Sequence, residues 1–202
     1  MEKFKSFISE QEVKIFSAFK DRSTYRCGKL VRIIDPKAIS CELSSGSLDK
    51  NNTVLLVGNS HADSIKTIFT KIAKNNDIST HFIIQNNPLM PGGLTPNRIV
   101  TEAKQKSINH IVVHFSPKGI KSESLTELVA LSQENDMRVT FIDPIPVWFE
   151  HVPKEMYFQL KGSVANLHQT KEEYMLIHEE FFKDINKINS ENFKRIPVVD
   201  YF

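Results

Sequence analysis

The stretch TVLLVGNSHA, residues 53–62, decides the fold class of this chain. Residues 53–57 form a continuous run that Gly58 ends, and such a run is typical of a strand buried on both faces of a parallel sheet. Apolar side chains then recur at helical spacing between Ala62 and Lys74. The stretch therefore predicts a buried strand, a sharp turn at Gly58 and a helix.

The same alternation of strand and helix patterns continues to the end of the chain. We expect further strands at 80–85, 110–115, 138–142 and 196–199, and helices at 97–106, 122–135 and 170–188. This order predicts a three-layer α/β/α fold with a parallel, flavodoxin-like sheet. Residues 1–52 are expected to form a helical and irregular lead-in, with an amphipathic helix over 1–22, and residues 53–202 the α/β domain.

Composition excludes several function classes. The 202 residues carry a net charge of +2 with no long basic block, which argues against nucleic-acid binding. No apolar run is long enough to cross a bilayer, and the charged N-terminal residues do not form a signal peptide. Cys27 and Cys41 are the only two cysteines, too few thiols for a zinc site. Their spacing fits either two reduced thiols or a disulfide.

The turn after the first buried strand is the expected place for chemistry, because open parallel sheets bind ligands beyond the carboxyl ends of their strands. Ser60 falls at the start of the following helix, where free N–H groups and the helix dipole favour negative charge. A hydroxyl there could attack an ester carbonyl, and the N–H groups could hold the resulting oxyanion. Two simpler interpretations remain open. Asn59 or Ser60 could be only a helix N-cap, or the turn could bind phosphate, although it has a single glycine.

Residues 58–62, Gly-Asn-Ser-His-Ala, resemble the first sequence block of the SGNH hydrolases. The form is similar to the Gly-Asp-Ser-His-Ala of SGNH domains fused to multi-pass membrane O-acyltransferases. Further segments resemble that subgroup in the same order, and the resemblance spans residues 25–202. They are the two-cysteine segment 27–41, Asn-Pro-Leu at 87–89, the third strand and block at 112–116, the Asp-Pro-x-Pro turn at 143–146 and the last strand at 197–202.

The resemblance implies a role for several residues. Ser60 would be the nucleophile and its own N–H one oxyanion donor, with Gly92 and Gly93 as candidates for a second donor. The crevice around the serine would be framed by Asn59, His61, His114 and Ser116. The broader family often has an asparagine donor in the block at 112–116, and this chain has none there. The resemblance also favours a Cys27–Cys41 disulfide.

One expected element is missing from the sequence. The family's catalytic base is a histidine three residues after an aspartate, beyond the last strand, and no Asp-x-x-His occurs here. A serine without a positioned base is a poor nucleophile. We expect the chain to be a fragment that ends before the Asp/His segment, the alternative being a domain that has lost catalysis. We do not expect another histidine, such as His151 or His168, to act as the base.

The resemblance therefore implies serine-dependent transfer or hydrolysis of an acyl group, with acetyl favoured, on hydroxyls of a cell-surface polysaccharide. It implies no metal or organic cofactor. The partners would be an acyl donor, a polysaccharide acceptor and a tethered membrane acyltransferase domain outside this chain, which would place the domain in the periplasm or at the cell surface. Two alternatives are a non-catalytic module that binds a glycan or protein, and a flavodoxin-like nucleotide binder.

Overall fold

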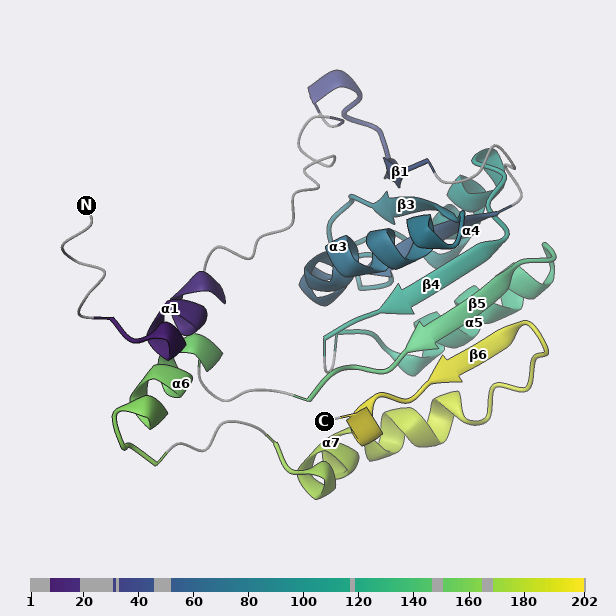
Figure 1. The fold of residues 1–202 in the computed structure, drawn as a ribbon. Helices are drawn as coiled ribbons and strands as arrows, with labels where there is room; N and C mark the ends of the chain where they lie inside the picture. The colour runs from purple at the N-terminus through teal and green to yellow at the C-terminus, as the bar shows by residue number, and fades with distance from the viewer. Residues whose placement is uncertain are drawn as a thin grey trace.

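The computed structural model describes residues 8–18, 31, 33–45, 52–116, 119–146, 151–164 and 169–201. A six-stranded sheet forms the centre, in the order β1-β3-β2-β4-β5-β6, with helices on both of its faces (Figure 1). The strands are β1 Ser40–Ser44, β2 Thr53–Gly58, β3 Ser79–Ile83, β4 His110–His114, β5 Arg138–Ile142 and β6 Phe193–Ile196. The three-layer α/β/α prediction is confirmed.

Strand pairing gives the sheet its topology. Strands β2 to β6 pair in parallel in the order β3-β2-β4-β5-β6, and β1 adds an antiparallel edge next to β3. Without β1, this is the flavodoxin-like order. All five parallel strands therefore end at the same edge of the sheet, where the turn after β2 also lies.

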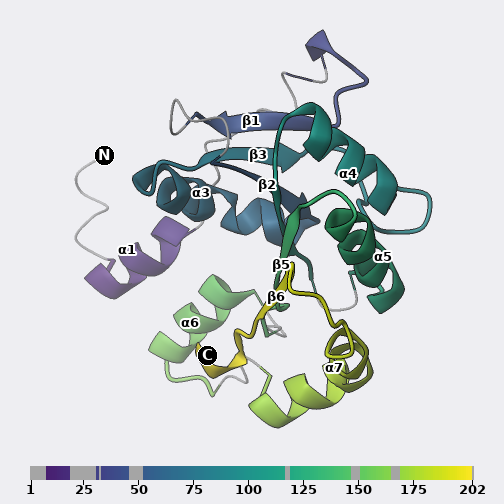
Figure 2. The ribbon, with the colours of Figure 1, turned by 90° about the vertical axis from the view of Figure 1, so that its right-hand side faces the viewer.

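The helices cover the two faces unequally. They are α1 Glu10–Ser17, α3 Ser60–Asn75, α4 Pro96–Gln105, α5 Ser122–Gln133, α6 Val152–Leu160 and α7 Lys171–Ile185. Helices α4, α5 and α7 lie side by side on one face (Figure 2), and we call this the covered face. Helix α3 packs on the opposite face, over β2 and β3, while α1 and α6 pack against each other.

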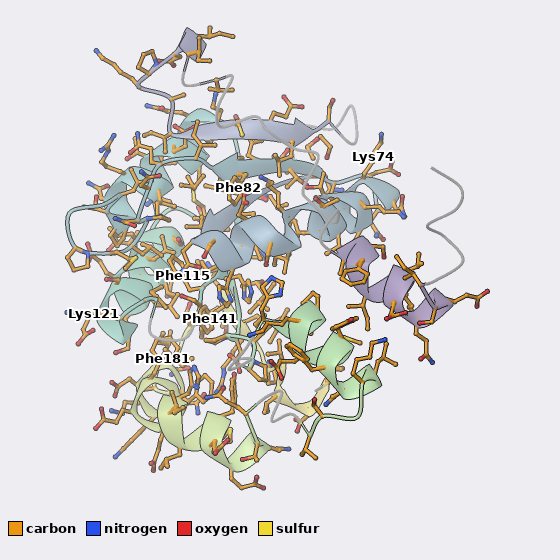
Figure 3. The ribbon with its side chains drawn as sticks, turned by 90° about the vertical axis from the view of Figure 1, so that its left-hand side faces the viewer. Lys74, Phe82, Phe115, Lys121, Phe141 and Phe181 are labelled. Atoms are coloured by element: carbon orange, nitrogen blue, oxygen red, sulfur yellow. The ribbon has the colours of Figure 1, made fainter. Side chains whose placement is uncertain are left out.

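Alternate residues of each strand build two hydrophobic cores, because successive side chains point to opposite faces of a sheet. Leu55, Val57 and Phe141 belong to the larger core under α4, α5 and α7. Leu56 and Phe82 belong to the smaller core under α3. Figure 3 shows Phe82 beside α3 and Phe141 near Phe181 of α7. Parallel strands buried on both faces explain the continuous apolar run of β2.

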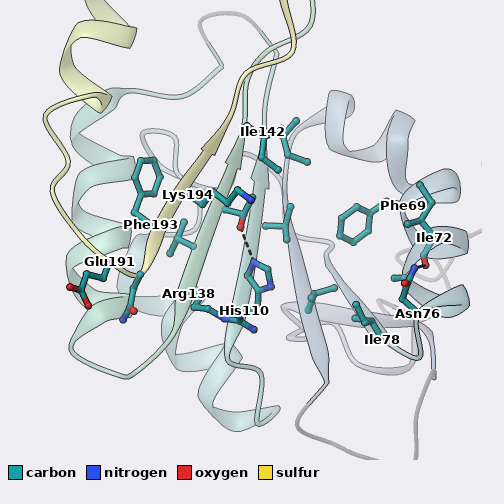
Figure 4. A pocket seen from close by; sticks show the side chains of 17 residues that line it. Phe69, Ile72, Asn76, Ile78, His110, Arg138, Ile142, Glu191, Phe193 and Lys194 are labelled. Atoms are coloured by element: carbon teal, nitrogen blue, oxygen red, sulfur yellow. Dashed lines mark hydrogen bonds between the residues drawn. The ribbon is translucent and has the colours of Figure 1, made fainter. Parts of the chain in front are cut away.

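The face that α3 packs on also carries a groove. Beside α3, residues of β4, β5 and β6 line a groove of about 560 Å³, which we call the sheet-face groove (Figure 4). Its floor includes His110, Val112 and Ile142, and Phe69 and Ile72 of α3 form one wall. The groove is largely apolar, and the His110 ring is hydrogen-bonded to Thr140 Oγ1 at 2.9 Å.

One arginine adds to the pairing with β5 that holds the edge strand β6. Arg195 donates from Nε and Nη2 to both carboxylate oxygens of Asp143, each at 2.8 Å, and Asp143 is fully buried. The guanidinium also lies 3.9 Å from the ring centroid of Phe182 on α7. A bidentate pair of this kind fixes geometry as well as charge, so it joins β6 to the end of β5 and to α7.

The structure differs from the sequence prediction at three places. Residues 40–44 of the lead-in form β1, although irregular structure was expected there. Helix α6 was not predicted, and β6 begins at Phe193, three residues before the expected strand. Within the described residues, no helix has the length and apolar character needed to span a membrane.

Candidate functional site

The turn between β2 and α3 depends on Gly58. In the parallel register Gly58 lies opposite His114 of β4. A Cβ atom on Gly58 would lie 1.8 Å from the backbone oxygen of His114 and 2.6 Å from Cβ of Ala62. Only glycine fits so close a contact between backbones. The absent side chain therefore brings the start of α3 directly against the carboxyl end of β4.

Asn59 caps helix α3, and this resolves one of the alternatives left by the sequence. Its Oδ1 accepts the N–H of His61 at 3.1 Å, the usual N-cap arrangement. Ser60 is the first helical residue and is exposed. Because Asn59 supplies the side-chain cap, the Ser60 hydroxyl is not needed for that task and faces solvent at the helix N-terminus.

The same Asn59 side chain binds the loop that follows β4. Its Oδ1 also accepts the N–H of Ser116 at 3.1 Å, and its Nδ2 donates to Ser116 Oγ at 2.7 Å. We call these two bonds the Asn59–Ser116 clasp. Gly119 closes over it, since a Cβ there would lie 2.6 Å from Ser116 Oγ and 2.7 Å from Asn59 Nδ2. The clasp fixes the turn that carries Ser60 relative to the neighbouring strand.

Two histidines lie beside the serine turn. The rings of His61 and His114 are 6.2 Å apart between centroids. The Nδ1 atom of His114 is 3.3 Å from the carbonyl oxygen of Ile142, which can only accept, so Nδ1 is the donor. His114 Nε2 and His61 Nδ1 are buried and have no hydrogen-bond partner among the described residues.

Burial is the main influence on both rings. It lowers the pKa of His61 and of His114 from the ordinary value of 6.5, and for His114 the bond to Ile142 opposes this only in part. Both imidazoles are therefore neutral near pH 7. Neither is hydrogen-bonded to a carboxylate among the described residues, so the orienting partner of a serine–histidine–aspartate triad is not found at either ring.

The two candidate oxyanion glycines differ from each other. They lie in the loop after β3, which is closed by a bond from Leu89 N–H to Leu94 O at 2.8 Å. The Gly93 N–H already donates to Met90 O at 2.9 Å. Gly92 is exposed, with a φ of +75°. Gly92 is thus the better of the two candidates for a second oxyanion donor, and that role remains a prediction.

The remaining residues singled out in the sequence are the two cysteines and two loop histidines. Cys41, on β1, is disulfide-bonded, whereas Cys27 lies outside the described residues. His168 also lies outside them, and His151 immediately precedes α6 as its N-cap residue. The structure thus brings together Asn59, His61, His114 and Ser116 around the turn that presents Ser60.

Gly119 was missed by sequence reasoning. Its N–H donates to Ser116 O at 2.9 Å, so it closes a tight turn immediately after the clasp. A glycine three residues after a strand-end serine was the available signal, but such a pattern is typical of many ordinary turns.

Comparisons with known proteins support the fold. No family model and no curated protein sequence matches the chain. Among solved structures, the periplasmic domain of a lipopolysaccharide acetyltransferase from Salmonella ser. Paratyphi A is similar, with a TM-score of 0.51 and 16% identity over 77% of this chain and 68% of that one.

Two more distant structures also match. A marine microorganism esterase has a TM-score of 0.35 and 9% identity over 74% of this chain and 64% of that one. A PLP-bound C-S lyase from Staphylococcus hominis has a TM-score of 0.34 and 14% identity over 67% of this chain and 35% of that one. Likeness at this level concerns the fold alone. The chain therefore has a three-layer α/β/α fold similar to that of the periplasmic acetyltransferase domain.

Proposed function

We propose that this chain is an SGNH-type domain that transfers or hydrolyses acyl groups, with Ser60 as the nucleophile. The observation that carries the proposal is the exposed Ser60 hydroxyl on the first residue of α3, left uncommitted because Asn59 caps the helix. Its place at the carboxyl edge of a parallel sheet is where such folds bind substrates.

The proposed chemistry follows from this position. The hydroxyl oxygen of Ser60 attacks the carbonyl carbon of an ester while a general base takes its proton and later passes it to the leaving alkoxide. The resemblance assigns this role to the histidine of an Asp-x-x-His segment, which this sequence does not contain. The Ser60 N–H, at the positive end of the α3 dipole, stabilises the negative oxygen that forms. Loss of the donor alkoxide leaves an acyl-serine, and a sugar hydroxyl or water then takes the acyl group. The likeness to an acetyltransferase domain supports acetyl as the group and a cell-surface polysaccharide as the acceptor.

The proposal extends to the setting of the protein. The similar structure is described as a periplasmic domain. We infer an extracytoplasmic location for this domain and a functional partner in a membrane acyltransferase domain. Neither inference is needed for the chemistry at Ser60, and each can fail separately.

Active-site labelling tests the nucleophile. The chain, and a form extended past Phe202 wherever the gene continues, would be treated with p-nitrophenyl acetate or a serine-directed phosphonate and analysed by intact mass and peptide mapping. We expect one modification at Ser60 that is lost in Ser60→Ala. Ser64→Ala is the matched control, because Ser64 is also exposed on α3 and only donates to His61 O at 2.7 Å.

The outcome separates two functions. The absence of a carboxylate at His61 and His114 among the described residues favours a second candidate, a glycan-binding module without turnover. If a folded, extended protein left Ser60 unmodified while Ser60→Ala bound glycans as tightly as the parent, the catalytic proposal would be wrong and the binding module correct.

A further inference from the structure

A small cavity lies next to the clasp, on the covered side of the sheet. It has a volume of about 240 Å³ and is bounded by Ser116, the start of α5, Pro144 after β5, and α7. Ser116 is the residue that binds Asn59, which directly precedes Ser60. The cavity therefore adjoins the proposed catalytic turn and is separate from the sheet-face groove.

His178 lines this cavity and carries a buried ring nitrogen without a partner among the described residues. Its ring is 3% exposed and lies on α7 between the rings of Tyr174 and Phe182, at 4.5 Å and 5.2 Å between centroids. Its Nδ1 is 2.9 Å from the carbonyl oxygen of Tyr174 and so donates to it. The other ring nitrogen, Nε2, is buried without a partner in the described part of the chain. A buried polar atom left without a partner costs stability unless a ligand or water satisfies it.

The other walls combine apolar surface with one cation. Ile120, Ile177 and Phe181 supply the apolar part, and Lys121 stands at the start of α5. Lys121 is the N-cap residue of α5 but makes no side-chain cap bond. The first N–H groups of α5 thus receive no side-chain acceptor from Lys121, whose ammonium group can only donate, so both kinds of group can act as donors at this end of the helix.

We propose that this cavity, the His178 cavity, binds one pyranose ring of the acceptor glycan. A pyranose has apolar C–H faces that suit Ile177 and Phe181. It has hydroxyl groups, which can both donate and accept, for His178 Nε2, and hydroxyl or carboxylate oxygens that can accept from Lys121. This inference rests on the proposed function, because it treats a sugar as the acceptor. The pyranose ring would lie beside Ser116, and the next sugar unit of the same glycan would extend to Ser60.

Direct binding tests the cavity without requiring catalysis. Ser60→Ala protein would be titrated with methyl glycosides of glucose, galactose, mannose, N-acetylglucosamine and glucuronic acid, followed by saturation-transfer and protein-detected NMR. We expect at least one glycoside to shift the signals of α7 and of residues 119–121. Stronger binding of the glucuronide would identify an acidic sugar, and equal binding of its neutral counterpart a neutral one.

Two variants locate the site. Ile177→Trp fills the cavity from a position that is 44% exposed, so folding should be retained. His178→Phe keeps the ring stacking but removes Nε2. Each should weaken binding about tenfold or more, the effect of one lost buried hydrogen bond or of lost space. Lys183→Gln, on the same helix but away from the cavity, should bind like the parent.

The outcomes distinguish this inference from the catalytic proposal. Glycoside binding that Ile177→Trp abolishes supports the His178 cavity even if Ser60 is never acylated. If Ser60 is acylated but no glycoside binds, or binding is unchanged in folded Ile177→Trp, the cavity is not a sugar site and the catalytic proposal survives. Should His178→Phe fail to fold, Ile177→Trp alone decides.

Discussion

The two faces of the sheet differ in how they are covered, and the difference separates stability from function. On the covered face, α4, α5 and α7 bury the larger core, including Phe141 and Tyr174, which are fully inaccessible. On the other face α3 packs over β2 and β3, and the sheet-face groove lies beside it. In the described part of the chain, the main contacts of α3 are with strands, whereas α5 packs against both α4 and α7. The clasp gives the end of α3 that carries Ser60 an additional side-chain anchor to the loop after β4.

The largest expected effect on stability comes from truncating one aromatic side chain on each face of the sheet. Phe141→Ala, on the covered face, should lower the free energy of unfolding by about 3–5 kcal/mol, the usual cost of a large cavity in a closed core. Phe69→Ala, on the half-buried side of α3 facing the groove, should cost only about 1 kcal/mol, since solvent can relax into the space. Urea denaturation of both variants measures the contrast, and equal losses would contradict the distinction between the faces.

A smaller effect is expected at the end of α3. Asn59→Ala removes the cap and both bonds of the clasp, so the free energy of unfolding should fall by about 1–2 kcal/mol and Ser60 labelling should slow. Thr95→Ala is the matched control, because Thr95 caps α4 by accepting the Arg98 N–H but lies outside the clasp. It should lose similar stability while Ser60 reacts at the parental rate. An equal slowing in Thr95→Ala would show that stability alone controls the reaction.

The last effect concerns acid and the floor of the sheet-face groove. Burial, with the nearby Arg138 charge, lowers the pKa of His110 from 6.5 to about 4 in the folded chain. Above pH 6.5 the ring is neutral in both states and its full contribution to stability is present. As the pH falls from 6.5 towards 4, the unfolded chain takes up the proton first and stability is lost.

His110→Gln should therefore show a shallower fall in stability between pH 7 and pH 4.5 than the parent, measured by denaturant titration at each pH. Part of the slope should remain, because burial also lowers the pKa of His61, His81 and His114. Identical slopes in parent and variant would exclude His110 as a source of acid sensitivity.

The sequence predicted the parts of the fold that are buried on both sides. The runs that became β2 and β4 are largely apolar and buried, and they were placed to within a residue or so. Strand β5 was placed correctly as well, from a shorter pattern in which buried Val139 and Phe141 alternate with less buried residues. Strand β1 was missed because Ser40–Ser44 is a mostly polar edge strand without such a run. Helix α6 was missed because none of its residues is buried, so no periodic apolar face marks it. Strand β6 alternates half-buried and exposed residues, and the apolar pattern misplaced it by three positions.

The candidate site was only partly predictable for a similar reason. The preference of helix starts for Asn and Ser pointed to residues 59 and 60, but could not say which would be the cap. The bond between Asn59 and Ser116 joins residues 57 positions apart and arises only because β2 and β4 are neighbours. Likewise, His178 and Ser116 come from different elements, and no local pattern indicates that they share a cavity.

A single oxygen atom, Asn59 Oδ1, receives one hydrogen bond from the helix that carries Ser60 and another from the loop that borders the His178 cavity. Because both bonds share this oxygen, a shift of Ser116 would either break its bond or move the Asn59 side chain, which is also bonded to the first turn of α3. A ligand that displaced this loop would therefore also change the position of the turn that carries Ser60, because both are bonded to the same amide oxygen.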